Sequence, residues 1–341
     1  MSTHLPHLLI VGNTSRGSIE NYYIKHLKLL GHKVDVYEIQ KKVNYRSLAT
    51  RIRFRFGDSS IYRFLNKTLI EYADQISPDI IWIFKGSEIY TNTIIELKNK
   101  EHYLVNYNPD HPFIRTLSGN GGENIESAVP FYDLHFSYRN DLVTDFRKNF
   151  NTLSSRLPFG FENDDIFKEA MKSKDLKRGI CFVGNPDKIR SNLLNEIGCA
   201  GFKVDVFGNG WNKFKLNKNI YYHNAVNGIE FWKILKTYSI QLNIFRPHNI
   251  GSHNMRTFEI PAIGGLQLAP ESAENREFFL PDSEIVLYSS VEELNEKINW
   301  LLENPNIVKD IKEASYKKCL ASEYSYFHRS KLASDVFQSF K

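Results

Sequence analysis

The stretch "NMRTFE", Asn254 to Glu259, places an arginine and a glutamate one helical turn apart. We expect a helix to begin near Ser252 to Asn254, where the first turn presents unpaired backbone N–H groups and about half a positive charge. Met255 and Arg256 fall in this turn, and the guanidinium fork of Arg256 is suited to phosphate oxygens. The carboxylate of Glu259 could accept both hydroxyl groups of a ribose. An Arg–Glu pair on the exposed side of an amphipathic helix is the open alternative.

A second candidate lies in "NYNPDHP", where Asp110 and His111 follow an expected strand at 103–108. In parallel α/β sheets, ligands and reactive groups gather at the carboxyl ends of the strands. Either side chain could therefore serve as a general base. The alternative is that Asp110 caps a turn and that His111 is a surface histidine.

The segment "GNTSRGS", 12–18, lies at the corresponding end of the first expected strand. Its side chains Asn13, Ser15 and Arg16 could contact a ligand there. The two glycines do not form a P-loop, because neither Lys-Ser nor Lys-Thr follows them.

A repeated pattern indicates how these residues are positioned. "KVDVY" at 33–37 returns as "KVDVF" at 203–207, and each copy follows a "VGN", at 11–13 and at 183–185. Between them, apolar residues recur with helical spacing, so each copy reads as strand, helix and strand. Chance similarity between two ordinary βαβ units is the alternative. Both readings predict an α/β protein with two doubly wound sheets.

Two domains are expected. Residues 1–162 would form the first, and residues 163–177, rich in charged and short polar side chains, would form a linker. Residues 178–341 would form the second domain, whose last helix could pack back on the first. Length alone also favours two domains, at about 150 residues each.

The composition, 42% hydrophobic and 24% charged without a low-complexity tract, is typical of a soluble protein. A net charge of +5, from 44 Lys and Arg against 39 Asp and Glu, is too small to indicate nucleic-acid binding. The three cysteines have no paired spacing, so neither a disulfide framework nor a zinc site is indicated. No stretch approaches a signal peptide or the roughly 20 apolar residues of a membrane span. We therefore expect a cytoplasmic protein.

The segment "NMRTFEIPAIGG", followed by "REFFLPDSEIVLYSSVEELNEKINWLLENP", closely resembles the C-terminal domain of CgeB-like glycosyltransferases of the spore maturation protein type. "FVGN" with Arg190, "VFGNGW" at 206–211, "PDIIWIFKG" and "YNPDHP" are similar to the same family, so the resemblance covers nearly the whole chain. It implies a GT-B fold, in which two Rossmann-like domains face each other across a cleft. It also implies a bacterial enzyme of cell-surface glycan biosynthesis that moves a sugar from a nucleotide-sugar donor, such as a UDP-sugar, to a glycan, lipid-linked or protein acceptor.

Residue by residue, the resemblance implies a donor site in the second domain and an acceptor side in the first. Glu259 resembles the glutamate that holds the donor ribose, and the helix start at 254–256 resembles the seat of the diphosphate. The loops at 184–190 and 208–210 resemble those beside the phosphates and the base, although both could be tight turns after buried strands. The implied donor-binding residues are Gly184, Asn185, Arg190, Gly208, Gly210, Asn254, Met255, Arg256 and Glu259, and the acceptor-side residues are Asn13, Ser15 and Arg16.

The sequence departs from the wider GT-B pattern at Gly251. Many retaining members have a glutamate at this position, eight residues before the ribose glutamate, so the configuration of the product is left open. His253 or Asn254 could take over its contacts, and His253 therefore joins Asp110 and His111 as a candidate catalytic residue.

The sequence contains no D-x-D motif, the carboxylate pair by which GT-A transferases hold a metal. We therefore expect activity without a metal or other cofactor, the helix terminus and arginines neutralising the leaving group. Two other functions stay open. One is a nucleotide-sugar epimerase or hydrolase, and the other is a non-catalytic protein that binds a nucleotide sugar or assembles a surface or spore layer.

Five arginines are interleaved with aromatic and aliphatic residues in Tyr45 to Leu65. Such a segment could rest on an anionic membrane surface and give peripheral access to a lipid-linked acceptor. A solvated helix that packs its apolar side on the first domain is the alternative, and the sequence favours it.

Overall fold

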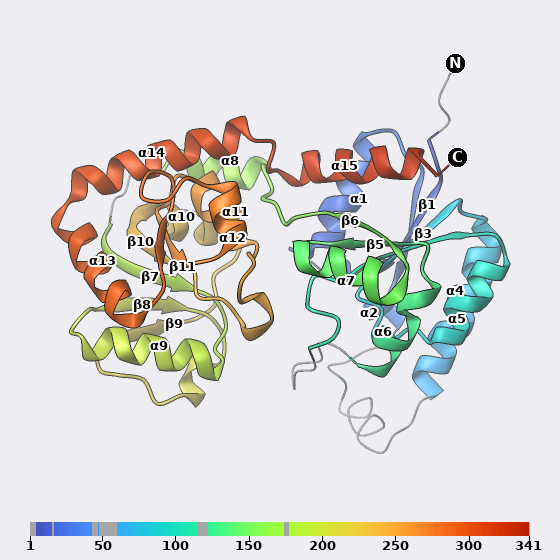
Figure 1. Cartoon of the computed structure of the whole chain (residues 1–341), viewed down its shortest axis with the longest axis horizontal. Coiled ribbons are helices and arrows are strands. Elements are labelled where there is room, and N and C mark those ends of the chain that lie inside the picture. Colours follow the sequence, from blue (N-terminus) through green and yellow to red (C-terminus); the bar gives the residue numbers. More distant parts are fainter. Residues whose placement is uncertain are drawn as a thin grey trace. The chain divides into compact units, whose positions relative to one another are not determined.

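The computed structural model describes residues 5–15, 17–42, 47, 60–114, 122–173 and 177–340. They form two compact units, each built on its own sheet (Figure 1). Unit 1 comprises Met1–Pro158 and Tyr326–Lys341, and unit 2 comprises Phe159–Ser325. The chain therefore passes between the units twice, after Pro158 and after Ser325.

Unit 1 contains a six-stranded parallel sheet with the order β2-β1-β3-β4-β5-β6. The strands are β1 (Leu8–Gly12), β2 (Val34–Glu38), β3 (Ile80–Phe84), β4 (Tyr103–Tyr107), β5 (Leu134–Ser137) and β6 (Leu153–Arg156). Every residue of β1 and β3 is buried, as their continuous apolar runs predict for central strands covered on both faces. The chain leaves β1 for β2 on one side and returns to β3 on the other. The carboxyl ends of β1 and β3 therefore form a topological switch point.

Helices cover this sheet, and the C-terminal helix is one of them. The helices of unit 1 are α1 (Ile19–Leu29), α2 (Ile39–Lys42), α4 (Ser60–Ile76), α5 (Thr91–Asn99), α6 (Glu123–Ala128), α7 (Asn140–Phe150) and α15 (Tyr326–Gln338). The rings of Tyr22 on α1 and Tyr326 on α15 stack with centroids 4.7 Å apart. His32, just beyond α1, forms a hydrogen bond of 2.8 Å with Ser334 on α15. These contacts fix α15 to unit 1 (Figure 1).

Unit 2 contains a second six-stranded parallel sheet, with the order β12-β11-β10-β7-β8-β9. The strands are β7 (Lys177–Val183), β8 (Val204–Phe207), β9 (Ile220–His223), β10 (Tyr238–Leu242), β11 (Gln267–Pro270) and β12 (Val286–Tyr288). The chain runs outward from β7 to β9 and then returns to β10 on the other side of β7. The switch point of this sheet therefore lies between the carboxyl ends of β7 and β10.

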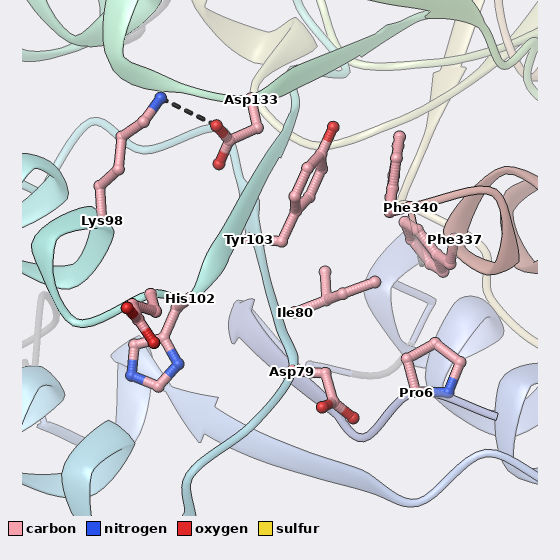
Figure 2. A pocket seen from close by; sticks show the side chains of 10 residues that line it. Pro6, Asp79, Ile80, Lys98, His102, Tyr103, Asp133, Phe337 and Phe340 are labelled. Carbon is pink, nitrogen blue, oxygen red and sulfur yellow. Dashed lines mark ion pairs between the residues drawn. The ribbon is translucent and has the colours of Figure 1, made fainter. Parts of the chain in front are cut away.

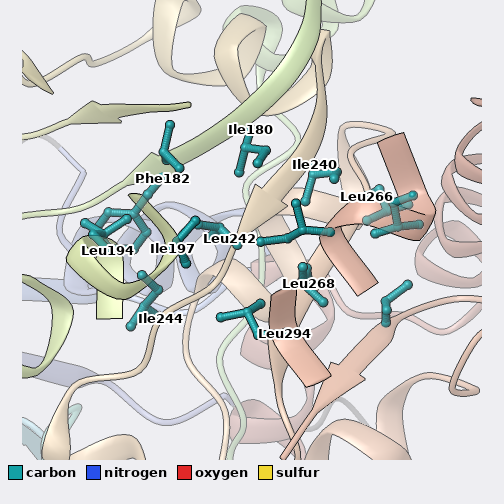
Figure 3. Close-up of a cluster of buried hydrophobic side chains, with 14 of the residues drawn as sticks. Ile180, Phe182, Leu194, Ile197, Ile240, Leu242, Ile244, Leu266, Leu268 and Leu294 are labelled. Carbon is teal, nitrogen blue, oxygen red and sulfur yellow. The ribbon is translucent and has the colours of Figure 1, made fainter. Parts of the chain in front are cut away.

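The core of unit 2 is apolar and joins the sheet to its helices. The helices are α8 (Asp165–Met171), α9 (Lys188–Cys199), α10 (Ile229–Thr237), α11 (Arg256–Ala262), α12 (Ala273–Phe278), α13 (Val291–Glu303) and α14 (Pro305–Ala321). Figure 3 shows Leu194 of α9 and Leu294 of α13 packed among strand residues such as Ile180, Leu242 and Leu268. These side chains are less than a twentieth exposed, so burial of apolar surface holds the strands that carry the switch point.

The two copies of the repeat are β1-α1-β2 in unit 1 and β7-α9-β8 in unit 2. In each sheet the first strand of the copy flanks the switch point, and the second strand lies directly beside the first. The predicted α/β class with two doubly wound sheets is confirmed.

The segment expected to be a linker, 163–177, contains helix α8. The side chain of Asp164 caps this helix by accepting a hydrogen bond of 2.8 Å from the N–H of Phe167. The Phe167 ring packs edge-on against Trp232 of α10, with centroids 5.0 Å apart. Three of the charged residues that suggested a linker, Asp165, Lys168 and Glu169, lie on the exposed side of this short helix.

Most of the arginine-rich segment at 45–65 lies outside the described residues; its last part, from Ser60, begins α4. Among the helices that the structure describes, none is both long and apolar enough to cross a membrane.

Candidate functional site

In unit 2, the loops that follow β7 and β8 are joined at the switch point. The N–H of Gly184 donates to the carbonyl oxygen of Phe207 at 2.9 Å, and the Trp211 indole N–H donates to the carbonyl oxygen of Gly184 at 2.9 Å. The side-chain oxygen of Asn185 accepts from the N–H of Asn209 at 3.0 Å. A Cβ atom at Gly208 would clash with the carbonyl oxygen of Gly184, so the loops approach this closely because Gly208 has none.

Gly210 has a φ of 92°, a left-handed conformation that favours glycine, and it precedes the short helical turn that positions Trp211. The structure thus brings together four of the residues that the resemblance implies for donor binding, namely Gly184, Asn185, Gly208 and Gly210. Packing or backbone conformation also explains why each of these residue types occurs at its position, as the tight-turn alternative requires.

Arg190 was expected to approach the phosphates. In the structure its guanidinium group donates hydrogen bonds to the backbone of two loops. The residue is 8% exposed, and Nε and Nη2 donate to the carbonyl oxygen of Ile244 at 3.1 and 2.9 Å. Nη1 donates to the carbonyl oxygen of Asn185 at 3.0 Å. One guanidinium group therefore connects the loop after β7 to the loop after β10, across the switch point.

Two further guanidinium groups lie within electrostatic reach of Arg190. Burial lowers the pKa of Arg190 to about 10; the nearby Asp187 opposes this shift, and the positive charges of Arg246 and Arg256 add to it. Arg246 is half-buried, four residues beyond β10. Arg246 was not among the residues selected from the sequence, although an arginine that soon follows a buried strand at a switch point can be recognised there.

Arg256 is the first residue of α11, and its guanidinium group has two partners. It forms a short ion pair with Glu259 and lies over the ring of Phe231, 4.4 Å from the ring centroid. The Arg256 side chain is 27% exposed and that of Glu259 only 7%. The ion pair between Arg256 and Glu259 is thus formed. Its carboxylate is buried, which differs from the alternative of a pair on the exposed side of an amphipathic helix.

Helix α11 begins two to four residues later than expected, because Asn254 caps it. The Asn254 side-chain oxygen accepts from the N–H of Thr257 at 3.2 Å, and its amide group donates to Asn243 at 2.8 Å. Met255 lies between Asn254 and the helix, and its backbone angles are already helical. Both side-chain groups of Asn254 are therefore engaged within the protein. The partly exposed charge at this helix start is that of Arg256, beside the buried carboxylate of Glu259.

His253, a candidate catalytic residue, has a structural role here. Its side chain is fully buried, with Nδ1 2.6 Å from a carboxylate oxygen of Glu274. Nε2 accepts a hydrogen bond of 3.3 Å from the N–H of Phe159, so the ring proton lies on Nδ1 and is donated to Glu274. The expectation that His253 takes part in the reaction does not fit this burial.

Gly251 stands where the wider pattern has a glutamate, and it has a φ of 79° in an exposed turn. A glutamate would be strained in this backbone conformation. The missing carboxylate therefore reflects a different loop geometry and not only a substituted side chain.

In unit 1, residues from three segments lie near the carboxyl ends of β1, β3 and β4. Asn13 closes the loop after β1: its side-chain oxygen accepts from the N–H of Ser15 at 2.8 Å. Asp110 forms an ion pair of 3.1 Å with Lys85, and its N–H donates to the side-chain oxygen of Asn108 at 3.0 Å. The carboxylate is thus both part of a turn and paired with a cation.

His111 follows Asp110 at this edge of the sheet. Its Nδ1 accepts a hydrogen bond of 3.3 Å from the N–H of Phe113, and the two rings contact edge-on. Arg16 lies outside the described residues. Glu20 and Lys85, which the sequence analysis did not select, also belong to this edge.

A cavity of about 410 Å³ in unit 1 lies at the opposite edge, where β3 and β4 begin. Figure 2 shows Lys98 paired with Asp133, 2.8 Å apart, and Tyr103 beside Phe340. The carboxylates of Asp133 and Asp79 also accept backbone N–H groups at 2.8 and 2.6 Å. The cavity is therefore separate from the switch point of unit 1, and two of its carboxylates hold neighbouring strands together.

The two-unit architecture is that of GT-B glycosyltransferases. Sucrose-phosphate synthase from Thermosynechococcus elongatus has a TM-score of 0.72 at 9% identity, over 98% of this chain and 99% of that one. Anabaena HepE in complex with UDP and glucose has a TM-score of 0.68 at 12% identity, over 98% and 100%. A putative UDP-N-acetylglucosamine 2-epimerase from Listeria monocytogenes has a TM-score of 0.62 at 11% identity, over 99% and 97%. At such identities the likeness establishes the fold alone.

Residues 190–334 match the model of a family described as glycosyl transferase-like. The match begins at Arg190 and includes Arg246, Arg256 and Glu259. No curated protein matches the sequence. The chain thus has a GT-B fold and a glycosyltransferase-like sequence over most of unit 2.

Proposed function

We propose that this protein is a metal-independent glycosyltransferase of the CgeB-like type, which moves a sugar from a nucleotide-sugar donor to a glycan, lipid-linked or protein acceptor. The observation that carries the proposal is the pairing of Arg256 with the buried carboxylate of Glu259, beside Arg190 and Arg246, at the switch point of a GT-B sheet. Positive charge at this position suits a diphosphate, and the adjacent carboxylate suits ribose hydroxyl groups.

The proposed reaction develops negative charge on the diphosphate of the donor. As the acceptor oxygen bonds to the anomeric carbon, the bond from that carbon to the diphosphate oxygen breaks, and its electron pair leaves with the diphosphate. The growing negative charge is stabilised by guanidinium groups that are already in place. From its place beside Glu259, Arg256 can donate to the diphosphate while the Glu259 carboxylate accepts the ribose hydroxyl groups.

The acceptor side is assigned to unit 1, where Asn13, Ser15, Asp110 and His111 lie near the carboxyl ends of the strands. We place the enzyme in a bacterial cytoplasm, with peripheral membrane contact if the acceptor is lipid-linked, and in the assembly of a surface glycan. The choice of donor sugar and base depends on a few loop side chains.

Calorimetric titration with UDP-glucose tests the proposal first, because HepE forms a complex with UDP and glucose. A thermal-shift panel of UDP-, GDP-, CMP- and dTDP-sugars extends it, since a ligand at 100 times its Kd stabilises by about 2.7 kcal/mol. We expect one base to give saturable binding that the double variant R256A/E259A loses. If no nucleotide sugar binds, the proposal is wrong.

A nucleotide-sugar epimerase or hydrolase is the second candidate. The structure described as a putative UDP-N-acetylglucosamine 2-epimerase from Listeria monocytogenes supports it, because this chain shares its fold over 97% of that chain. Incubation with donor alone distinguishes the candidates, because an epimerase would form an isomeric nucleotide sugar and a hydrolase would release free sugar quickly. Binding without turnover under any condition would instead favour a non-catalytic or layer-assembly protein.

A further inference from the structure

We propose that the cavity where β3 and β4 begin is a second ligand site, and that it binds a small organic cation, an alkylamine. The cavity has a volume of about 410 Å³ and is lined by residues of unit 1 alone (Figure 2). Substrates of parallel α/β sheets bind at the opposite edge, beyond the carboxyl ends of the strands. A molecule bound in this cavity would therefore be neither the sugar donor nor the acceptor, so the site is independent of the proposed glycosyl transfer.

The apolar part of the cavity wall comes from distant parts of the chain. The ring of Tyr103, the first residue of β4, stacks on the ring of Phe340, beyond the end of α15, with centroids 4.0 Å apart. Phe337 of α15 is fully buried beside them, and Ile80 and Pro6 complete this part of the wall (Figure 2). Aromatic and aliphatic groups of this kind accept an alkyl chain, and the rings also attract a cation.

The polar part of the wall carries an excess of negative charge. Asp79, Glu101 and Asp133 contribute three carboxylates, against the one ammonium group of Lys98. That ammonium group is 2.8 Å from Oδ1 of Asp133 and donates to the carbonyl oxygen of Phe131 at 3.2 Å. Within the described ranges of the chain, neither Asp79 nor Glu101 has a cationic partner. These two carboxylates are therefore the charges in the cavity that a ligand can neutralise.

The other polar groups of the wall are also suited to accept hydrogen bonds. Asp79 uses Oδ2 for the N–H of His7, at 2.6 Å, and its second oxygen keeps its lone pairs. His102 Nδ1 lies 2.8 Å from the carbonyl oxygen of Pro78, so this nitrogen carries the ring proton and Nε2 of the neutral ring is an acceptor. An ammonium group matches these acceptors with its three N–H donors. A phosphate or carboxylate would instead be repelled by Asp79 and Glu101.

Size and overall charge favour a specific site for a small amine. The cavity volume falls within the range of about 300–1,000 Å³ that is typical of small-molecule sites. The whole chain has a net charge of +5, so its overall field does not attract cations. A cation that binds this protein must therefore be held by a local group of acceptors, and the cavity provides one.

The test compares putrescine, butanediol and succinate. All three have a four-carbon backbone, and they end in ammonium, hydroxyl and carboxylate groups respectively. Each is titrated into the full chain at constant ionic strength, and binding is followed by thermal shift and by ligand-observed NMR, since a ligand of the folded state raises Tm. We expect saturable binding of putrescine alone. The proposal is wrong if putrescine does not bind, or if succinate or butanediol binds as well as putrescine does.

Glu101→Gln tests the charge of the cavity. The Glu101 side chain forms no hydrogen bond within the part of the chain that the structure describes, so we expect Tm of the free variant to be unchanged. Its affinity for putrescine should fall about tenfold, because a hydrogen bond to a charged group is replaced by one to a neutral group. Glu96→Gln, in the neighbouring helix α5, removes an exposed carboxylate outside the cavity and is the matched control. An equal loss in both variants would show that putrescine senses only the overall charge.

Phe340→Leu tests the aromatic wall. Leucine keeps an apolar side chain but has no ring face, so putrescine affinity should fall by about 2- to 5-fold. Phe64→Leu replaces an exposed phenylalanine of α4 that is not part of the cavity, and it should leave affinity unchanged. If Glu101→Gln and Phe340→Leu both bind putrescine as tightly as the unaltered protein, the amine binds elsewhere and the proposal fails. None of these measurements uses a nucleotide sugar, so their outcome is separate from that of the proposed function.

Discussion

Arg256 and Glu259 form an ion pair across one turn of α11, and the Arg256 guanidinium group lies on the ring of Phe231. The aromatic ring supports the guanidinium plane from one side, and the carboxylate holds its edge. The pair is therefore held in a defined orientation before any ligand binds, and this pre-organisation is what a diphosphate site requires.

Replacing Glu259 with glutamine should weaken UDP-glucose binding by about 10- to 100-fold. Charge-assisted hydrogen bonds contribute roughly 1.5 to 3 kcal/mol, and glutamine keeps the shape while removing the charge. Calorimetry provides the measurement, and Glu230→Gln on the exposed side of α10 provides the control. Unchanged affinity would rule out Glu259 as the ribose ligand.

The substitution Arg256→Lys should reduce turnover more than donor binding. Lysine keeps the charge but offers no planar fork to stack on Phe231, and the diphosphate becomes more negative as the sugar leaves. We expect kcat to fall at least tenfold and Kd to rise by less than threefold. Equal losses would mean that Arg256 only anchors the ground state.

For Arg190, Arg190→Lys should lower stability rather than donor affinity alone. A single ammonium group cannot replace three N–H donors that reach the carbonyl oxygens of Asn185 and Ile244. Each buried carbonyl left without a donor costs about 1–3 kcal/mol, which a urea midpoint measures directly. A stable variant that has lost UDP-glucose binding would instead favour the phosphate contact predicted from the sequence.

Treatment with EDTA should leave sugar transfer unchanged. The reason is that positively charged side chains lie at the switch point and that the sequence lacks a D-x-D motif. UDP release before and after dialysis against EDTA is the measurement. Loss of activity that Mn²⁺ or Mg²⁺ restores would contradict the metal-independent reading.

Lys312 of α14 should make unit 2 more stable as the pH rises from about 8 toward 10.5. Burial lowers the pKa of Lys312 to about 8 from an ordinary value of 10.5. Within this window the unfolded chain binds more protons than the folded protein, so the free energy of unfolding increases with pH.

Lys312→Met should remove that increase, because methionine does not titrate. Urea midpoints between pH 7.5 and 10 provide the measurement, and Lys317→Met on the exposed face of α14 provides the control. Parallel pH profiles for Lys312→Met and the unaltered protein would show that folding does not lower the pKa of Lys312.

The amino-acid sequence by itself determined the fold class and indicated candidate site residues in the second unit. Apolar periodicity is a local property, so "KVDVY" and "KVDVF" identified two βαβ units before any contact was known. The same local logic located Arg256, Glu259 and Asp110, because residues that follow strands or begin helices can be recognised from their neighbours.

Only the tertiary structure decided what several of these residues contact. His253 is buried because Glu274 and Phe159 enclose it. Arg190 connects two loops because Ile244, which is 54 residues away in sequence, is adjacent to it in space. Glu20 reaches the N–H of Asn13 because Gly12 leaves room for its carboxyl group. Burial and charge pairing depend on segments far apart in the chain, and no pattern of nearby residues specifies them.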